Sequence, residues 1–207
     1  MTAVKLEDAD KSQDVYLDTS AFFPLGVARA VEEGTPGWSS RTAFSQELQR
    51  ARRIRDFARR DPSKTSGKIW LSILALEELM AIMRNRLLAR EANSAGYDSP
   101  REMRKQDAGA WKASVSKVQT EVHRFSGLAY NEALHLGVIL SRTVVSTDFQ
   151  DKSAAKLRKR HREVFHKNPF LDAMDALHIV TAAEFGTKAF VTFDNAWKQS
   201  GGIDVLY

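Results

Sequence analysis

The sequence contains no cysteine among its 207 residues. Disulfide bonds and zinc or iron–sulfur sites held by thiolates are therefore excluded, and this absence fits the reducing cytoplasm, where we expect the protein. No apolar run is long enough to cross a bilayer, so we expect no membrane association. The first fourteen residues, MTAVKLEDADKSQD, are polar and partly acidic, which does not fit a secretory signal.

The composition is that of one ordinary globular domain. Hydrophobic residues make up 43% of the chain and charged residues 28%, and the length is sufficient for a sizeable core. The formal net charge of +5 makes nucleic acid or another anionic partner plausible. A basic protein without such a partner explains the charge equally well.

Short apolar segments alternate with longer amphipathic ones along the chain. Strands are expected at residues 15–18, 69–74, 143–146, 188–194 and 203–207. Helices are expected at about residues 44–57, 77–90, 111–125, 129–140, 152–165 and 168–185. Asn168 should cap the last of these helices with Pro169 in its first turn, and Gly186 should end it.

This alternation predicts an α/β fold in which helical crossovers join parallel strands. Residues 1–13 are expected to be a polar lead that frays outside the domain. In folds of this class, ligands bind beyond the carboxyl ends of the strands, near a switch in strand order. Asp18, which closes the first strand "VYLD", would lie at such a position.

Other acids occupy comparable positions in the predicted elements. They are Glu77 and Glu78 after the second strand, Asp194 at the end of "AFVTFD", and Asp172 and Asp175 in the apolar helix "LDAMDALHIVTAAEFG". Asp175 lies among apolar residues at helical spacing, which argues against an arbitrary solvent-facing acid. Each other acid also has a purely structural explanation, as a helix cap, a partner of the helix dipole or a turn residue.

A group of converging carboxylates has restricted chemistry. The carboxylates repel one another, and some would take up protons unless a cation compensates them. Mg²⁺ or Mn²⁺ suits such a site, because both prefer oxygen ligands and retain waters for substrate phosphates. An ion of this kind can activate a water and stabilise the oxygens of a reacting phosphodiester. The pattern therefore favours a metal centre over acid–base work by side chains alone.

Four stretches, in chain order, resemble the PIN domain, a metal-dependent ribonuclease fold that includes VapC-type toxins. They are "VYLDTSAFF", "LSILALEELMAI", "DAMDALHIVTAAEFG" and "AFVTFDNAW". The acids of the family pattern match Asp18, Glu78, Asp175 and Asp194, and Glu78 aligns better than Glu77. The resemblance implies a three-layer α/β/α sandwich with a parallel central sheet, one or two Mg²⁺ or Mn²⁺ ions, and hydrolysis of RNA phosphodiester bonds.

The resemblance also implies a role for each acid. Asp18, Asp175 and Asp194 would be the main metal ligands, directly or through water. Glu78 would be a ligand or would orient a metal-bound water.

Four neighbouring positions have a less definite role. Ser20 and Thr192 could support the carboxylates, although ordinary turn and strand hydroxyls explain them slightly better. Asp172 could widen the metal site or be a solvated neighbour, with equal weight. His178 shares a helical face with Asp172 and Asp175, and it is expected to pack or to support the site rather than to bind the metal.

The chain is longer than a compact PIN domain. We expect residues 14–207 to form a single PIN-like domain with helical insertions at about residues 26–66 and 90–130. The insertions leave the four-acid pattern intact.

Two basic clusters could contact nucleic acid through phosphate oxygens. Residues 50–60 carry six arginines, and a solvated helix face is the better interpretation there because the cluster lies in an insertion. Residues 156–167 precede the Asp175 helix, so substrate contact is slightly favoured. The residues concerned are Arg158, Lys159, Arg160 and Arg162, with Trp197 as a stacking platform for a base.

The leading hypothesis is a Mg²⁺- or Mn²⁺-dependent endoribonuclease, most plausibly the toxin of a type II toxin–antitoxin pair. The implied partners are an RNA substrate, an antitoxin that blocks the acidic site and a second copy of the chain in a homodimer. The alternatives are a PIN nuclease of RNA processing or DNA metabolism, and a non-catalytic PIN-like domain that binds RNA or a partner. The presence of all four acids argues against the non-catalytic alternative.

Overall fold

The computed structural model describes residues 3–38, 40–59, 67–141, 152–184, 186–187, 189–199 and 204–207. Its strands are β1 (Ala3–Val4), β2 (Val15–Leu17), β3 (Ile69–Ser72), β4 (Ile139–Ser141), β5 (Ala189–Val191) and β6 (Asp204–Leu206). Its α-helices are α1 (Thr19–Glu32), α2 (Ser45–Ala58), α3 (Ile73–Ser94), α4 (Pro100–Gln106), α5 (Ala108–His135), α6 (Lys152–Lys167) and α7 (Ala173–Glu184). Two short 3-10 helices are η1 (Leu6–Asp8) and η2 (Asn195–Gln199).

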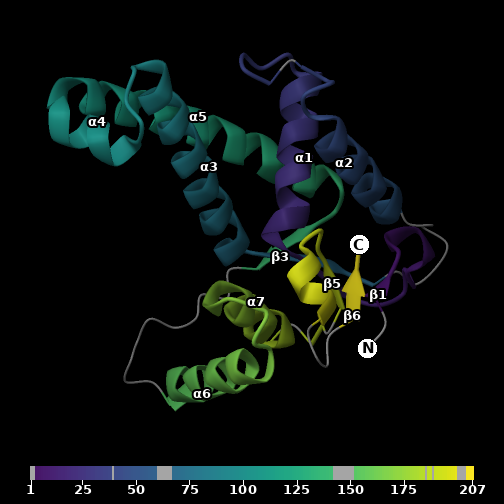
Figure 1. Cartoon of the computed structure of the whole chain (residues 1–207). Helices are drawn as coiled ribbons and strands as arrows, with labels where there is room; N and C mark the ends of the chain where they lie inside the picture. Colours follow the sequence, from purple (N-terminus) through teal and green to yellow (C-terminus); the bar gives the residue numbers. More distant parts are fainter. Residues whose placement is uncertain are drawn as a thin grey trace.

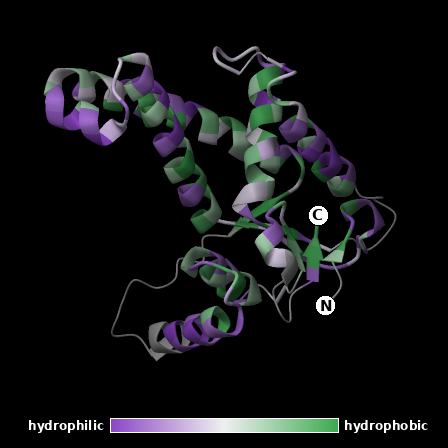
Figure 2. Ribbon diagram, viewed as in Figure 1, coloured by the Kyte–Doolittle hydropathy of each residue, from purple (hydrophilic) through white to green (hydrophobic). Residues whose placement is uncertain are grey.

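The strands form one parallel sheet in the order β1-β6-β5-β2-β3-β4. Figure 1 shows α1, α2, α3 and α5 on one side of this sheet and α6 and α7 on the other. The predicted three-layer α/β/α fold with a parallel sheet is therefore confirmed. Figure 2 shows that the strands are mostly hydrophobic, whereas the exposed α4 and α6 are largely hydrophilic.

The two layers of helices bury opposite faces of the central strand β2. Val15 and Leu17 pack in the larger core under α1, α3 and α5, whereas Tyr16 packs in a smaller core with Phe190 and Trp197. All three β2 side chains are fully buried. Alternate residues of a strand point to opposite faces, so a strand covered on both sides has to be apolar throughout.

The strand order reverses between β2 and β5. From β2 the chain proceeds through β3 to β4 on one side, and it then returns to build β5 and β6 on the other side of β2. The carboxyl ends of β2 and β5 therefore diverge at a topological switch point, where open α/β sheets form their ligand sites. Asp18 follows β2 directly, and Asp194 lies three residues beyond the end of β5.

The amino-terminal segment differs from the sequence-based expectation. The described part of residues 1–13 does not fray, because β1 pairs with β6 and extends the sheet. Leu6 is buried in the main core, and its backbone N–H donates to the carbonyl of Tyr207 at 2.9 Å. An edge strand of two residues gives too short a pattern to be recognised in a polar sequence.

Several predicted boundaries also shift. The helix predicted at residues 129–140 belongs to the continuous α5, which ends at His135. Gly137, with φ of 73°, ends it, and the N–H of Val138 bonds back to the carbonyl of Ala133 at 3.0 Å. β4 then occupies residues 139–141, and the strand predicted at 143–146 lies outside the described residues.

The predicted start of α7 is wrong. Asn168 does not cap that helix, because its side-chain amide donates to the carbonyl of Val164 at 2.8 Å, at the end of α6. Residues 168–171 form a turn, with the N–H of Leu171 bonded to the carbonyl of Asn168 at 3.0 Å. α7 begins only at Ala173. Its predicted end holds, since Gly186 has φ of 78° and the N–H of Thr187 bonds to the carbonyl of Ala182 at 3.2 Å.

The segments at about 26–66 and 90–130 are mostly helical in their described parts. They supply the second half of α1, all of α2 and α4, and most of α5. α5 packs against both α1 and α3, and α2 packs against α1. An aromatic cluster joins these helices, with the rings of Trp38 and Phe125 stacked at 4.5 Å between centroids. None of the described helices has the length and apolar character needed to span a membrane.

The crossing of α1 and α5 requires a glycine. A Cβ atom on Gly26 would lie 2.8 Å from the Cβ of Ala129 and 2.8 Å from the Cζ of Phe125. Gly127, on α5 itself, has open space around the corresponding position, with no heavy atom within 4 Å apart from its own helix.

The two substitutions to alanine should therefore have opposite effects. Gly26→Ala should lower the free energy of unfolding by about 1–2 kcal/mol, because the clash outweighs the better helix propensity of alanine. Gly127→Ala should raise it by about 0.5–1 kcal/mol, because only the propensity changes. Urea denaturation followed by circular dichroism measures both, and equal effects would contradict the close packing of α1 on α5.

Candidate metal centre

Asp18 is fixed at the junction of β2 and α1 by its own helix. It is the N-cap of α1 and is only 4% exposed. Its Oδ2 accepts hydrogen bonds from the Ser20 N–H at 3.2 Å, the Ser20 hydroxyl at 2.7 Å and the Thr192 hydroxyl at 2.9 Å. Its Oδ1 accepts no hydrogen bond from the described residues. Asp18 therefore caps the helix with one oxygen and leaves the other for a ligand.

The hydroxyls of Ser20 and Thr192 tie the ends of β2 and β5 together. Their oxygens lie 2.9 Å apart, and Ser20 also accepts the backbone N–H of Phe193 at 2.9 Å. Thr192 accepts the backbone N–H of Asp194 at 3.1 Å. Both hydroxyls thus hold the chain around Asp18. Support of the carboxylates was one of the two explanations that the sequence left open for Ser20 and Thr192.

Glu78 lies in the second turn of α3, because that helix begins four residues earlier than expected. Ser72 caps the helix, with its hydroxyl accepting the Ala75 N–H at 3.3 Å. The Oε2 of Glu78 accepts the Thr19 hydroxyl and lies 3.0 Å from the Nε2 of His178. Burial alone would raise the pKa of Glu78, but the hydrogen bonds from His178 and Thr19 outweigh it and lower that pKa. Glu78 is therefore an ionised carboxylate, and its Oε1 accepts no hydrogen bond from the described residues.

His178 is fully buried behind Glu78. Its Nδ1 lies 2.6 Å from the Tyr16 hydroxyl, which in turn lies 2.6 Å from the Ser72 hydroxyl. Because an ionised carboxylate only accepts, the ring donates from Nε2 to Glu78. Burial raises the pKa of Tyr16, so its hydroxyl keeps its proton. Ligand atoms of Asp18, Glu78 and His178 all lie within 4.8 Å of one another, but the Nε2 of His178 is occupied by Glu78.

Asp172 and Asp175 form a reciprocal cap at the start of α7. The Oδ1 of Asp172 accepts the N–H groups of Met174 and Asp175 at 2.7 and 2.9 Å, and the Oδ2 of Asp175 accepts the Asp172 N–H at 3.0 Å. This is the pairing of a capping box, built from two aspartates. Asp172, for which the sequence left two explanations, is therefore a cap that also borders the site.

Asp175 experiences the negative charge of its neighbours. Its Oδ1 also accepts the indole N–H of Trp197 at 3.1 Å. Burial first, and then the nearby charges of Asp172, Asp18 and Asp194, raise the pKa of Asp175 to about 6. Such a shift is the response expected of a carboxylate crowded by other carboxylates without a cation.

The four predicted acids line a single cleft of about 270 Å³. Asp194 completes the group from the turn after β5, where its Oδ1 accepts the Ala196 N–H at 2.8 Å. Glu77 does not border the cleft. The residues that line it are Asp18, Thr19, Ser20, Phe23, Glu47, Arg50, Glu78, Ile82, Arg86, Asp172, Asp175 and Asp194. Oxygen donors of this kind fit a hard divalent cation, although the roles of the individual acids stay predictions.

Three charged residues of the cleft were not predicted as site residues, namely Glu47, Arg50 and Arg86. Glu78, Ile82 and Arg86 recur at steps of four along α3, so the helical face of Glu78 already contained the signal for Arg86. Arg50 belongs to the basic cluster at residues 50–60 that was assigned to solvent. Arg50 lines the cleft, whereas the side chain of Arg52 is 85% exposed.

Two nucleic-acid contacts expected from the sequence are not supported by the geometry. Trp197 is completely buried between Phe190 and Asp175, so it has no free face for a base, and that prediction is wrong. Arg160 is directed to α7, where it pairs with Glu184 at 2.5 Å. Trp197 lies only three residues after Asp194, but its indole belongs to the core.

The comparison with known families agrees with this arrangement of a parallel sheet and an acidic cleft at its switch point. The sequence matches the PIN domain over residues 43–202, and the chain belongs to the PIN domain family. PIN domains are generally metal-dependent nucleases. The match includes Glu78, Asp175 and Asp194 but begins after β2, so the position of Asp18 beside them comes from the structure. Comparisons with curated proteins and with solved structures gave no significant match.

The adjacent pair Glu77 and Glu78 offers a direct test of the metal centre. Glu78→Gln should lower the affinity for Mn²⁺ about tenfold or more, because its amide nitrogen replaces the oxygen that is free for a cation. Glu77→Gln removes the same charge one residue away, outside the cleft, and should leave the affinity almost unchanged. Isothermal titration calorimetry of the metal-free protein measures both, and equal losses would show a general electrostatic effect instead of a site.

Proposed function

We propose that the protein is an endoribonuclease that depends on Mg²⁺ or Mn²⁺, with Asp18, Glu78, Asp175 and Asp194 as its metal-binding and catalytic residues. The observation that carries the proposal is the convergence of these four carboxylates on one cleft at the switch point of the sheet. The raised pKa of Asp175, due to burial and to neighbouring acids, supports it, because a divalent cation would relieve that crowding.

Different side chains of the cleft would bind the metal ion and orient its ligands. Asp18 and Glu78 would offer the oxygens that their hydrogen bonds leave free, while Ser20 and Thr192 hold the other oxygen of Asp18. Asp175 and Asp194 would complete the site from the opposite side of the switch point. A bound Mg²⁺ or Mn²⁺ supplies an activated water and neutralises charge at phosphorus. Asp172 borders the cleft and keeps α7 in position through its cap.

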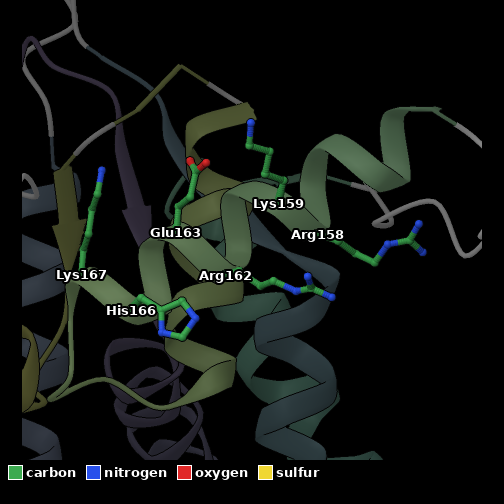
Figure 3. A pocket seen from close by; sticks show the side chains of 6 residues that line it. All are labelled: Arg158, Lys159, Arg162, Glu163, His166 and Lys167. Carbon is green, nitrogen blue, oxygen red and sulfur yellow. The ribbon is translucent and has the colours of Figure 1, made fainter.

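The basic face of α6 is the proposed surface for more distant phosphates of the RNA. Arg158, Lys159, Arg162 and Lys167 line a shallow hollow along this helix (Figure 3). Arg158 and Arg162 extend in the same direction from successive turns in this view. α6 packs on α7, which carries Asp175, so a strand bound at the acids could continue along it. Contacts of this type add affinity and salt dependence without reading the base sequence.

Cleavage by the wild type and by Asp18→Asn tests the nuclease assignment. Asparagine can keep the oxygen that accepts from Ser20 and Thr192, so the fold should be retained while the free oxygen becomes an amide. We expect the wild type to cut a labelled single-stranded RNA with Mg²⁺ or Mn²⁺, and the variant to be slower by about 100-fold or more. Initial rates with and without EDTA measure this, and Glu77→Gln is the matched active control.

The same assay separates the alternatives. Equal cleavage by the wild type and by Asp18→Asn would remove the activity from this cleft. Preferential cleavage of DNA would favour a role in DNA metabolism. Binding of RNA without cleavage under any tested metal would favour the non-catalytic PIN-like domain.

The biological role that we propose is that of a toxin in a type II toxin–antitoxin pair, supported by the resemblance to VapC-type sequences. The proposed partners are an antitoxin that inserts a cationic side chain into the acidic cleft and a second copy of the chain. Induced expression in a bacterial host should arrest growth, and Asp18→Asn at equal protein level should not. Normal growth with fully active wild-type enzyme would favour an RNA-processing role.

A further inference from the structure

Two arginines border the acidic cleft from opposite sides of α1. Arg50 is on α2 and Arg86 is on α3, and each of these helices packs against α1. Figure 1 shows α2 and α3 on either side of α1 above the sheet. The rest of the charged lining is acidic: Asp18, Glu47, Glu78, Asp172, Asp175 and Asp194. An arrangement with two cations among six acids would be expected to produce ion pairs.

Neither arginine forms one. Arg50 and Arg86 make no hydrogen bond or salt bridge to any described residue. By contrast, Arg55 on α2 lies 2.5 Å from Glu32, and Arg90 on α3 lies 2.8 Å from Glu121. The guanidinium groups at the cleft therefore retain their hydrogen-bonding edges for something other than the protein.

Both arginines are instead positioned by aromatic rings. The Cζ of Arg50 lies 5.1 Å from the centroid of Phe193, and the Cζ of Arg86 lies 5.2 Å from the centroid of Phe23. A cation–π contact uses the flat face of the guanidinium and leaves its N–H groups available. The side chain is thereby oriented without the carboxylates of the site being neutralised.

The two rings also fix the arginines relative to the acids. Phe193 immediately precedes Asp194, and its N–H is held by Ser20 at 2.9 Å. Phe23 is on the first turns of α1, which Asp18 caps, and it packs on Phe125 at 5.6 Å between centroids. Each arginine is therefore connected to a site acid through one short and well-packed segment.

We propose that Arg50 and Arg86 bind the two phosphates that flank the cleaved phosphodiester of a nucleic-acid strand. This inference rests on the proposed function and deepens it, because it assigns the substrate as a strand with at least one phosphate on each side of the bond that is cut. A guanidinium matches a phosphate by two parallel hydrogen bonds, and these two are free to form them. The acids alone would repel such a strand, so cations at the rim of the cleft are needed in addition to a central metal.

The experiment combines protein variants with changes in the substrate. Arg50→Gln and Arg86→Gln should each raise KM for a short single-stranded RNA about tenfold, as expected for loss of a charge-assisted contact. Each should also reduce the salt dependence of KM by about one unit of slope. The affinity for Mn²⁺, measured by calorimetry, should stay the same or rise, because a positive charge is removed; a purely structural defect would lower it. Arg52→Gln on α2 and Arg84→Gln on α3 are matched controls that lie outside the cleft.

A neutral methylphosphonate in place of each flanking phosphate completes the test. The methylphosphonate should raise the KM of the wild type about as much as the arginine substitution does. It should raise the KM of the corresponding variant little further, since the contact between that arginine and that phosphate has already been lost. Lysine at either position should restore only part of the loss, because it lacks the planar fork. The proposal would be overturned if the effects of the arginine substitution and of the methylphosphonate were additive. It would also be overturned if the wild type cleaved and Arg50→Gln and Arg86→Gln behaved like the controls Arg52→Gln and Arg84→Gln.

The outcome can be separated from failure of the proposed function. If the wild type does not cleave RNA, the nuclease assignment fails, and the arginine pair is judged by fluorescence anisotropy of the same RNA with Mn²⁺. Weaker binding by Arg50→Gln and Arg86→Gln than by the two controls would support the pair. Equal binding by all four variants, or no binding by the wild type, would overturn it.

Discussion

Mutual repulsion among the carboxylates at the switch point of the sheet is the constraint on which the rest of the site depends. Asp18, Glu78 and Asp175 are each placed near the amino-terminal end of a helix, namely α1, α3 and α7. The amino end of a helix carries partial positive charge and free N–H groups, so it is the most favourable backbone position for an anion. The parallel sheet brings three such ends together at one edge, where they offset part of the concentrated negative charge. Burial, and after it the neighbouring acids, still raise the pKa of Asp175 to about 6.

Hydrogen bonds fix the orientation of each acid of the site. Asp18 and Glu78 each accept these bonds at one carboxylate oxygen, so the other oxygen is available to a ligand. The Oδ2 of Asp18 accepts hydrogen bonds from Ser20 and Thr192, and the Oε2 of Glu78 accepts hydrogen bonds from Thr19 and His178. The hydrogen-bond chain from Ser72 through Tyr16 and His178 to Glu78 is buried within the fold. A carboxylate held in this way loses little further freedom when it binds a cation, which is the structural meaning of a preorganised site.

The sequence predicted those parts of the molecule that short-range patterns determine. The alternation of apolar strands and helices, the acids at strand ends and the cap of the last helix by Gly186 all depend on residues near one another in the chain. The sequence failed where a contact is distant. Trp197 looks exposed beside Asp194, but the packing of Phe190 on the far face of the sheet buries it. Arg50 looks like one of six surface arginines, and only the packing of α2 on α1 directs it into the cleft. The early end of α5 was a local signal, "HLGVIL", that the apolar pattern around Gly137 concealed.

Two of the helices in the segments predicted as insertions lie close to the site. α2 supplies Glu47 and Arg50 to the wall of the cleft, and Arg53 beside them donates to Glu7 at 2.9 Å near the amino terminus. α5 lies behind α1 and α3, and its Phe125 supports the ring of Phe23 on which Arg86 rests. The acids alone would present only negative charge to a polyanion. Arg50 on α2 and Arg86 on α3 place unpaired guanidinium groups at the rim of the cleft, so these two helices together make the approach of a phosphate strand electrostatically reasonable.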